Sequence, residues 1–274
     1  MRRVALLLAL IGLSHSALAA TSAPGFNLRW DQCYADGGTW NKNFACDTNA
    51  GSDRLVVSFE LANTLTQMSG VEISLDIGSS GASLPAWWQF KSTGTCRRTS
   101  LIASIDMPAG SVNCVDWGGG QTAGGIGTYN IGFLGANTAR LLVVAAVPQS
   151  SLATIVPGQE YFAFGLTIDH AKTVGSGACA GCNVPVCIFV SSMTLTTPVA
   201  ANDVMLGQGA NFLGSSYATW QNGYPTNVSR FCNGGPGVPR APNCVPANTT
   251  FQCVLATPTN SRRSTWGAVK ALYR

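Results

Sequence analysis

The chain has 274 residues and a formal net charge of +4, with 10% charged and 46% hydrophobic residues. Charged residues average near ~25% in soluble domains, so the solubility of this chain must depend on uncharged polar side chains and glycine. The small net charge excludes a general binder of polyanions such as nucleic acid. The charge is also unevenly distributed, because residues 20–229 contain eight bases and twelve acids, whereas residues 230–274 contain six bases and no acid.

The first 19 residues have the pattern of a secretory signal peptide. Two arginines precede a short apolar run, and a small-x-small motif ending at Ala19 fits a cleavage site. The run is too short to cross a membrane, and no later stretch is long and apolar enough to do so. We therefore expect a secreted, extracellular or cell-surface protein whose mature chain has no transmembrane segment.

All ten cysteines follow the expected signal peptide, and an even number in an exported chain indicates disulfide bonds. We expect Cys33 to pair with Cys46 and to close an N-terminal segment. Cys96 and Cys114 have a spacing that suits a disulfide across a hairpin. Three cysteines cluster in the middle and three lie near the end, so at least one bond must join the two groups if all of them pair. These six are Cys179, Cys182, Cys187, Cys232, Cys244 and Cys253.

The central cysteine cluster superficially resembles a metal site, because Cys179 and Cys182 form a Cys-x2-Cys motif. Zinc requires four ligands in tetrahedral geometry, but only three thiols lie here and the chain contains no second such motif. A redox role would place the motif at the start of a helix in a βαβ unit, which the sequence does not predict. We therefore expect no metal and no cofactor, and we interpret the cluster as structural disulfides.

Short segments rich in strand-forming residues alternate with turns rich in Gly, Pro, Asn and Ser, and no long helical periodicity occurs. In residues 70–77 apolar and polar side chains alternate, so Glu72 and Asp76 are expected on a solvent face. Residues 140–147 form a continuous apolar run, which favours a strand covered on both faces. The predicted strands, in chain order, span residues 54–62, 70–77, 84–90, 99–104, 129–133, 140–147, 160–169 and 186–197.

This pattern predicts an all-β fold, namely an antiparallel β-sandwich of immunoglobulin-like or cohesin-like architecture with disulfide-stapled irregular extensions. The last two predicted strands, with the cysteine cluster as the turn between them, are expected to form its centre. The expected organisation is a signal peptide at 1–19, a disulfide-closed segment at 20–53, the sandwich at 54–221, a Gly-, Pro- and Cys-rich extension at 222–260 and an amphipathic tail at 261–274.

Trp87 and Trp88 are adjacent in a predicted strand, so their side chains are expected to point to opposite faces. One exposed indole would offer a stacking platform for a sugar, which makes the two residues candidates for carbohydrate or surface-ligand binding. The competing interpretation places one indole in the core and the other under a loop.

Asp47, Asn49 and Asp53 place side-chain oxygens at alternate positions, as calcium-binding loops do. The segment lacks the distal bidentate glutamate and the full EF-hand spacing. The favoured interpretation is therefore a set of Asx turns before the next strand, with a calcium site as the weaker alternative.

Two patterns bear on a secreted hydrolase. Glu72 and Asp76 share a strand face, as a glycosidase pair would, but carboxylates on such a face are normally solvated. His170 is the one histidine after the signal peptide and lies beside Asp169, yet no Gly-x-Ser-x-Gly motif occurs. The sequence therefore identifies no catalytic residue, and hydrolysis is poorly supported.

The end of the chain forms an amphipathic segment after a Thr-Pro-Thr-Asn linker. Its apolar residues recur at helical spacing, and its bases lie near the C-terminal end, where a helix dipole favours cations. So short a segment seldom holds a helix alone in water, which favours recognition by another protein over a docked terminal helix. The residues of this expected sorting tail are Trp266, Val269, Lys270, Leu272, Tyr273 and Arg274.

Five motifs resemble those of an uncharacterised family of secreted bacterial proteins, and the resemblance extends over nearly the whole mature chain. The family has no assigned activity, so the resemblance implies none here. The tail is similar to recurring C-terminal endings of exported bacterial proteins, which implies a sorting or surface-attachment role. The motifs, in chain order, are LRWDQC, FACDTNAGS, LPAWWQFK, GACAGCNVPVCI and STWGAVKALYR.

Together these patterns predict a secreted or cell-surface structural or interaction protein that is not an enzyme. Its expected partner is secretion or surface-anchoring machinery, which would recognise the tail. The first alternative is a carbohydrate or surface-ligand binding module, and the second is a secreted hydrolase.

Overall fold

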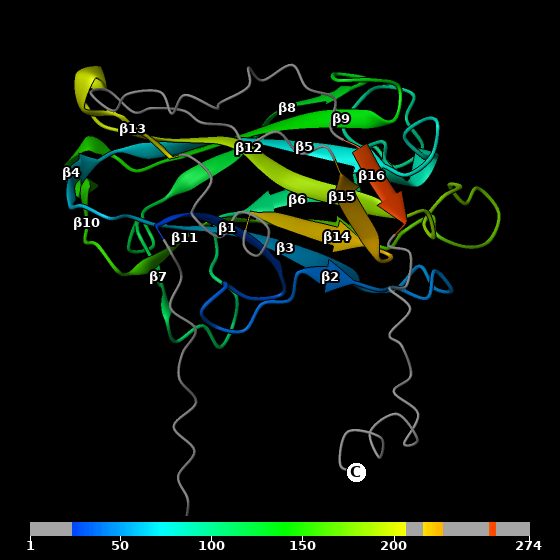
Figure 1. The fold of residues 1–274 in the computed structure, drawn as a ribbon, viewed down its shortest axis with the longest axis horizontal. Helices are drawn as coiled ribbons and strands as arrows, with labels where there is room; N and C mark the ends of the chain where they lie inside the picture. Colours follow the sequence, from blue (N-terminus) through cyan, green and yellow to red (C-terminus); the bar gives the residue numbers. More distant parts are fainter. Residues whose placement is uncertain (1–23, 207–215, 227–251, 256–274) are drawn as a thin grey trace, which may run out of the picture.

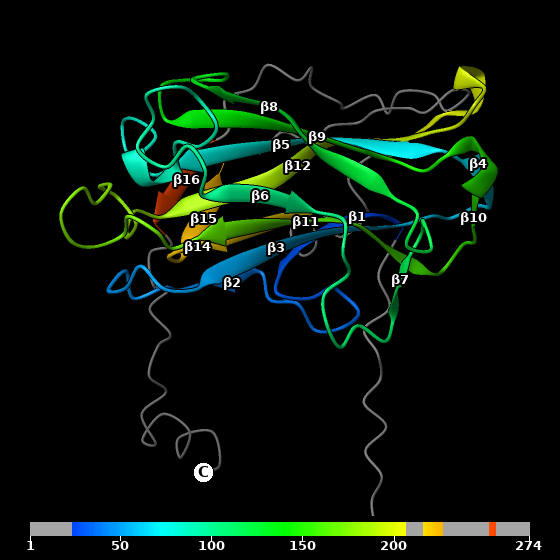
Figure 2. The ribbon, with the colours of Figure 1, turned by 180° about the vertical axis from the view of Figure 1, so that it is seen from behind.

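The computed structural model describes residues 24–206, 216–226 and 252–255, and these residues form an all-β fold with two main sheets. Figure 1 shows the two sheets as stacked layers, and Figure 2 shows the same layers from behind. The predicted β-sandwich is therefore confirmed. The predicted signal peptide and the predicted C-terminal tail lie within residues 1–23 and 256–274, outside the described residues.

The first sheet has five strands and is antiparallel except at one edge. The strand β11 is central, because it pairs with β3 and β6 on its two sides and β1 follows β3. The short β7 runs parallel to the start of β11. The strands are β1 (Gly25–Trp30), β3 (Ser52–Glu60), β6 (Leu101–Ser104), β7 (Cys114–Asp116) and β11 (Glu160–Asp169).

The second sheet has seven strands in the order β2-β14-β12-β5-β9-β8, and β13 also pairs with β12. All of its pairs are antiparallel except that of β2 with β14. The strands are β2 (Asn41–Lys42), β5 (Gly70–Ser79), β8 (Ala123–Ile131), β9 (Thr138–Ala146), β12 (Val186–Thr196), β13 (Val204–Leu206) and β14 (Tyr217–Trp220).

Two small two-stranded sheets and three 3-10 helices complete the described structure. One of these sheets, β15 with β16, packs against β12 and β5 on the outer face of the second sheet (Figure 1). The elements are β4 (Leu65–Met68), β10 (Ala153–Ile155), β15 (Gly223–Thr226), β16 (Gln252–Leu255), η1 (Ala86–Trp88), η2 (Gln149–Ser151) and η3 (Ala200–Asn202).

The core lies between the two sheets and is unusually rich in aromatic side chains. Trp30 from the first sheet and Trp220 from the second are both 0% exposed, and their ring centroids lie 5.8 Å apart. Burying each large side chain contributes about 1.5–3 kcal/mol, and paired aromatic rings add about 0.5–1.5 kcal/mol. Because these contacts join opposite layers, they fix the two sheets face to face.

The strands β11 and β12 have the predicted residues, but they do not form a hairpin. β11 belongs to the first sheet and β12 to the second, so the cysteine-containing segment between them crosses from one layer to the other. The expectation that residues 140–147 are covered on both faces is wrong for the second half of β9, where Val144 is 42% exposed. The sandwich also begins at Gly25 rather than at residue 54, because β1 and β2 each belong to a main sheet.

The disulfide pairing differs from both predicted pairs. Cys33 pairs with Cys114, Cys46 with Cys182, and Cys96 with Cys179, so neither Cys33–Cys46 nor Cys96–Cys114 forms. Short sequence spacing was a poor guide because the fold brings together segments that lie 81 to 136 positions apart. Cys187 is disulfide-bonded as well. The six cysteines named above pair with one another, so the partner of Cys187 is not among them.

Candidate functional site

The two adjacent tryptophans cannot act as a sugar platform. Trp87 and Trp88 are both 0% exposed, so the candidate platform with one exposed indole is wrong, and both indoles are covered, as the competing interpretation expected. The predicted strand is instead the 3-10 helix η1, which follows Pro85 and directs both side chains into the core. Trp87 stacks on Trp220 with 5.1 Å between the ring centroids, and its Nε1 donates a hydrogen bond to Thr173 Oγ1 at 3.0 Å.

A buried arginine, which the sequence did not single out, holds this helix in place. Arg97 is 1% exposed, and its guanidinium carbon lies 3.6 Å from the centroid of a Trp87 ring. It donates hydrogen bonds to the carbonyl oxygens of Trp87, Asp169 and Ala171. Burial lowers the pKa of Arg97 to about 10, with nearby Asp169 opposing that shift. The arginine is therefore charged at neutral pH and serves as a structural cation inside the fold.

Two of the three calcium candidates, Asn49 and Asp53, already have partners within the protein. Asn49 Oδ1 accepts hydrogen bonds from the backbone nitrogens of Thr173 and Val174 at 2.7 and 3.0 Å. Asp53 Oδ1 lies 3.0 Å from Lys42 Nζ, and the other oxygen of Asp53 contacts a histidine. Asp47 is exposed at the start of the turn. Asn49 and Asp53 thus fix a loop, and their contacts are with different partners and not with a shared site.

His170 is the histidine that contacts Asp53, and both of its ring nitrogens face acceptors. Nε2 lies 2.8 Å from Asp53 Oδ2, and Nδ1 lies 2.9 Å from the carbonyl oxygen of Ala50. The ring is 7% exposed and stacks on Phe44 at 3.9 Å. Because a general base needs a nitrogen lone pair aimed at substrate, this arrangement favours a structural role for His170.

The two carboxylates of β5 have different surroundings. Asp76 is 0% exposed and forms a bidentate ion pair with Arg140, with two nitrogen–oxygen distances of 2.6 Å. Ser191 Oγ also donates to Asp76. The prediction that Asp76 is solvated is therefore wrong, because Arg140 and Ser191 enclose its carboxylate. Glu72 is exposed as predicted, so the two do not form a catalytic pair.

One buried carboxylate lies beside a disulfide and could be mistaken for part of a metal site. Glu160 lies close to the sulfur atoms of Cys33 and Cys114. These sulfurs are bonded to each other and are not thiolates. Glu160 also accepts hydrogen bonds from the backbone nitrogens of Tyr34 and Ala35 at 3.0 and 2.8 Å. The group therefore anchors the loop after β1 to the first sheet.

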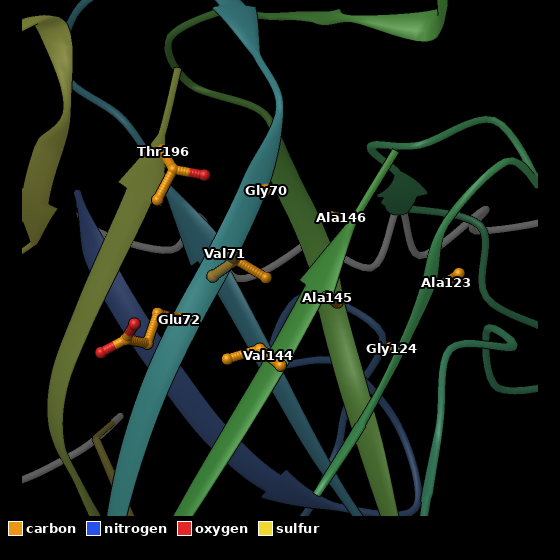
Figure 3. A pocket seen from close by; sticks show the side chains of 9 residues that line it. All are labelled: Gly70, Val71, Glu72, Ala123, Gly124, Val144, Ala145, Ala146 and Thr196. Atoms are coloured by element: carbon orange, nitrogen blue, oxygen red, sulfur yellow. The ribbon is translucent and has the colours of Figure 1, made fainter. Parts of the chain in front are cut away.

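A shallow groove of about 220 Å³ lies on the outer face of the second sheet, near one end of β5, β8, β9 and β12. It is hollow because small residues face each other in register, as Gly70 pairs with Ala146 and Gly124 with Ala145. A Cβ atom at Gly70 would lie 2.8 Å from the carbonyl oxygen of Ala145, so only glycine fits there. Figure 3 shows this groove with the residues that line it.

The groove has an apolar floor and one charged side chain. In Figure 3 Glu72 and Thr196 lie on the side of β12, whereas Ala123 and Gly124 lie on the side of β8. Among the described residues Glu72 has no ion-pair partner. The groove is thus suited to contact with an apolar group, with a carboxylate at its margin, and it contains no group suited to covalent chemistry.

A second cavity, of about 500 Å³, lies beside the disulfides at the end of the sandwich. Two disulfides, Cys46–Cys182 and Cys96–Cys179, contribute to its wall together with Thr173 and Asn183. The central cysteine stretch therefore lines a cavity as well as joining three loops. Its described lining contains no acid, base or histidine.

The exposed tryptophan of the described structure is Trp40, not one of the predicted pair. Trp40 is 48% exposed, and Tyr217 packs against it edge-on with 6.4 Å between the ring centroids. Asn41, which follows it, donates hydrogen bonds to the side-chain oxygens of Asn43 and Asn222 at 3.2 and 3.0 Å. Backbone pairing of β2 with β14 holds the segment. No sequence pattern distinguished Trp40 from the buried tryptophans.

No helix in the described part of the chain is long and apolar enough to cross a membrane. No family model matches the sequence, and no curated protein and no solved structure matches it either. The surfaces of this fold are therefore the basis for the proposed function.

Proposed function

We propose that the chain is a secreted or cell-surface protein that acts as a rigid interaction scaffold and not as an enzyme. The observation that supports this most is the disulfide framework, in which the three bonds between described residues join positions 81, 136 and 83 residues apart. Disulfides of this kind are typical of oxidising compartments outside the cytosol. They restrain segments that are far apart in the sequence, which suits a scaffold that presents fixed surfaces.

The proposal includes a role for residues 264–274 in sorting or surface attachment. Deleting these residues should move most of the protein out of the surface-bound fraction, because the recognition segment is then missing. Cell fractionation followed by quantitative blotting measures the distribution. A chain with the same eleven residues in scrambled order is the matched control, since it keeps length, composition and charge. An unchanged distribution after deletion would remove the sorting role.

A second function, binding of a neutral carbohydrate, is favoured by the surface at Trp40. An exposed indole offers an apolar face to a sugar ring. The neighbouring Asn41, Asn43 and Asn222 side chains bond to one another, and the amide hydrogens of Asn43 and Asn222 that remain are donors for hydroxyl groups. This candidate replaces the platform expected at Trp87 and Trp88.

For this second function, Trp40→Ala should weaken glycan binding by about tenfold or more, which corresponds to ~1.4 kcal/mol of lost stacking. A glycan array identifies the ligand, and titration calorimetry compares the variants. Val199→Ala, which removes a 53% exposed apolar side chain elsewhere, is the control. Carbohydrate binding is excluded if the natural chain retains no glycan or if Trp40→Ala binds equally well.

A further inference from the structure

The strand β8 is a long open edge of the second sheet. Among the described strands it pairs only with β9, and it spans the nine residues Ala123–Ile131. The other edges of the two sheets are protected. All six residues of β1 are buried, whereas β2, β6, β7 and β13 have only two, four, three and three residues.

The sequence of β8 contains none of the usual devices that prevent edge-to-edge pairing. Residues 123–131 include no charged residue and no proline, and most of them are exposed. Natural sheets normally protect an exposed edge with lysine, proline, shortness or a covering segment, because its unpaired N–H and C=O groups recruit another strand. Within the described part of the chain, the backbone of β8 forms hydrogen bonds to β9 alone. The backbone N–H and C=O groups on this edge are therefore available to pair with another strand.

We infer that this edge pairs with β8 of a second copy of the chain, forming an antiparallel two-fold dimer with a sheet continuous across the interface. Because the interface is isologous, each residue must tolerate its own counterpart nearby. An uncharged strand satisfies this condition, since no like charges are brought together. The one cation on the adjacent β9, Arg140, is neutralised by Asp76. This dimer would deepen the scaffold role proposed above, on which it rests.

Apolar side chains at one end of the edge would add to the interface. Ile131 is 37% exposed at the end of β8, and Phe133, which follows it, is 49% exposed. A register shift between Ile126 and Thr128 marks a bulge, which leaves a regular stretch of the edge on each side. Because an interface of one strand pair is smaller than a standard one, the dimer should be weak, with a Kd in the micromolar range.

Lysine at Gly125 tests the inference with little effect on the fold. A Cβ atom at Gly125 meets nothing within 4 Å, so the substitution fits, whereas at Gly124 a Cβ would lie 2.4 Å from the Val144 carbonyl oxygen. The natural mature chain, purified with its disulfides intact, should show a concentration-dependent dimer in sedimentation velocity. Gly125→Lys should weaken dimerisation by at least about tenfold, because two lysines would oppose each other at the edge. Thr128→Lys, on the other side of the bulge, should also weaken it.

The charge-matched control is Val112→Lys, at an 82% exposed loop position away from β8, which should dimerise like the natural chain. Near-ultraviolet circular dichroism confirms that each variant keeps its fold. A natural chain that stays monomeric up to ~100 µM overturns the inference, as does a dimer that both β8 variants leave intact. Either result would leave the tail-dependent localisation of the scaffold untouched, so the two proposals fail separately.

Discussion

Replacing Arg140 with methionine should destabilise the fold by about 3–5 kcal/mol, because it leaves the Asp76 carboxylate buried without its cation. The side chain of Asp76 is 1% exposed and that of Arg140 21% exposed, so water cannot replace the lost partner. Arg140 also lies 4.1 Å from the centroid of the Phe133 ring, a contact that methionine retains only in part. For a domain of this size the melting temperature should fall by roughly 10 °C.

The matched control is the double variant Asp76→Leu with Arg140→Met. It removes both charges together, and replacing a complete buried ion pair with apolar side chains is often close to neutral. Urea unfolding of the oxidised proteins gives the stability of each variant. The double variant should recover most of the stability lost in Arg140→Met, and the difference measures the coupling of the two charges. A loss below ~1 kcal/mol for Arg140→Met would show that this pair is solvated.

The central strands could be predicted from the sequence because their pattern is local. The predicted strands at 70–77, 160–169 and 186–197 match β5, β11 and β12 to within two residues at each end. In each of them strand-forming apolar residues follow one another, and tertiary contacts reinforce that preference. The layer to which each strand belongs is not a local property, which is why β11 and β12 were taken for neighbours.

The errors in the candidate site have a common physical cause, since each depends on segments distant in the sequence. Asp76 is buried against Arg140 and Ser191, which lie 64 and 115 positions away in the sequence. Trp87 and Trp88 are buried together because both rings pack against Trp220, which lies far along the chain, with 5.1 and 5.6 Å between the ring centroids. The cysteine pairs follow the same rule, since each bond joins segments far apart in the sequence.

Replacing both Cys46 and Cys182 with serine should destabilise the protein by about 4 kcal/mol, since the bond closes a long loop of the unfolded chain. The sequence separation is 136 residues, but Cys96–Cys179 ends only three positions from Cys182 and already shortens the loop that remains to be closed. Because the entropy depends only logarithmically on loop length, that nesting reduces the cost by less than ~1 kcal/mol. Urea unfolding under non-reducing conditions gives the value.

Removing Cys33–Cys114 is the informative comparison, because its cost should be similar while its local effect should differ. Its sequence separation is 81 residues, and it packs against Val56 and Phe162, away from the tryptophan cluster. Cys182, in contrast, accepts a hydrogen bond at its carbonyl oxygen from Trp220 Nε1 at 2.6 Å. Loss of Cys46–Cys182 should therefore change the near-ultraviolet dichroism of the tryptophans, whereas loss of Cys33–Cys114 should not. Equal spectra for the two variants would contradict the view that the central cysteine segment positions the aromatic core.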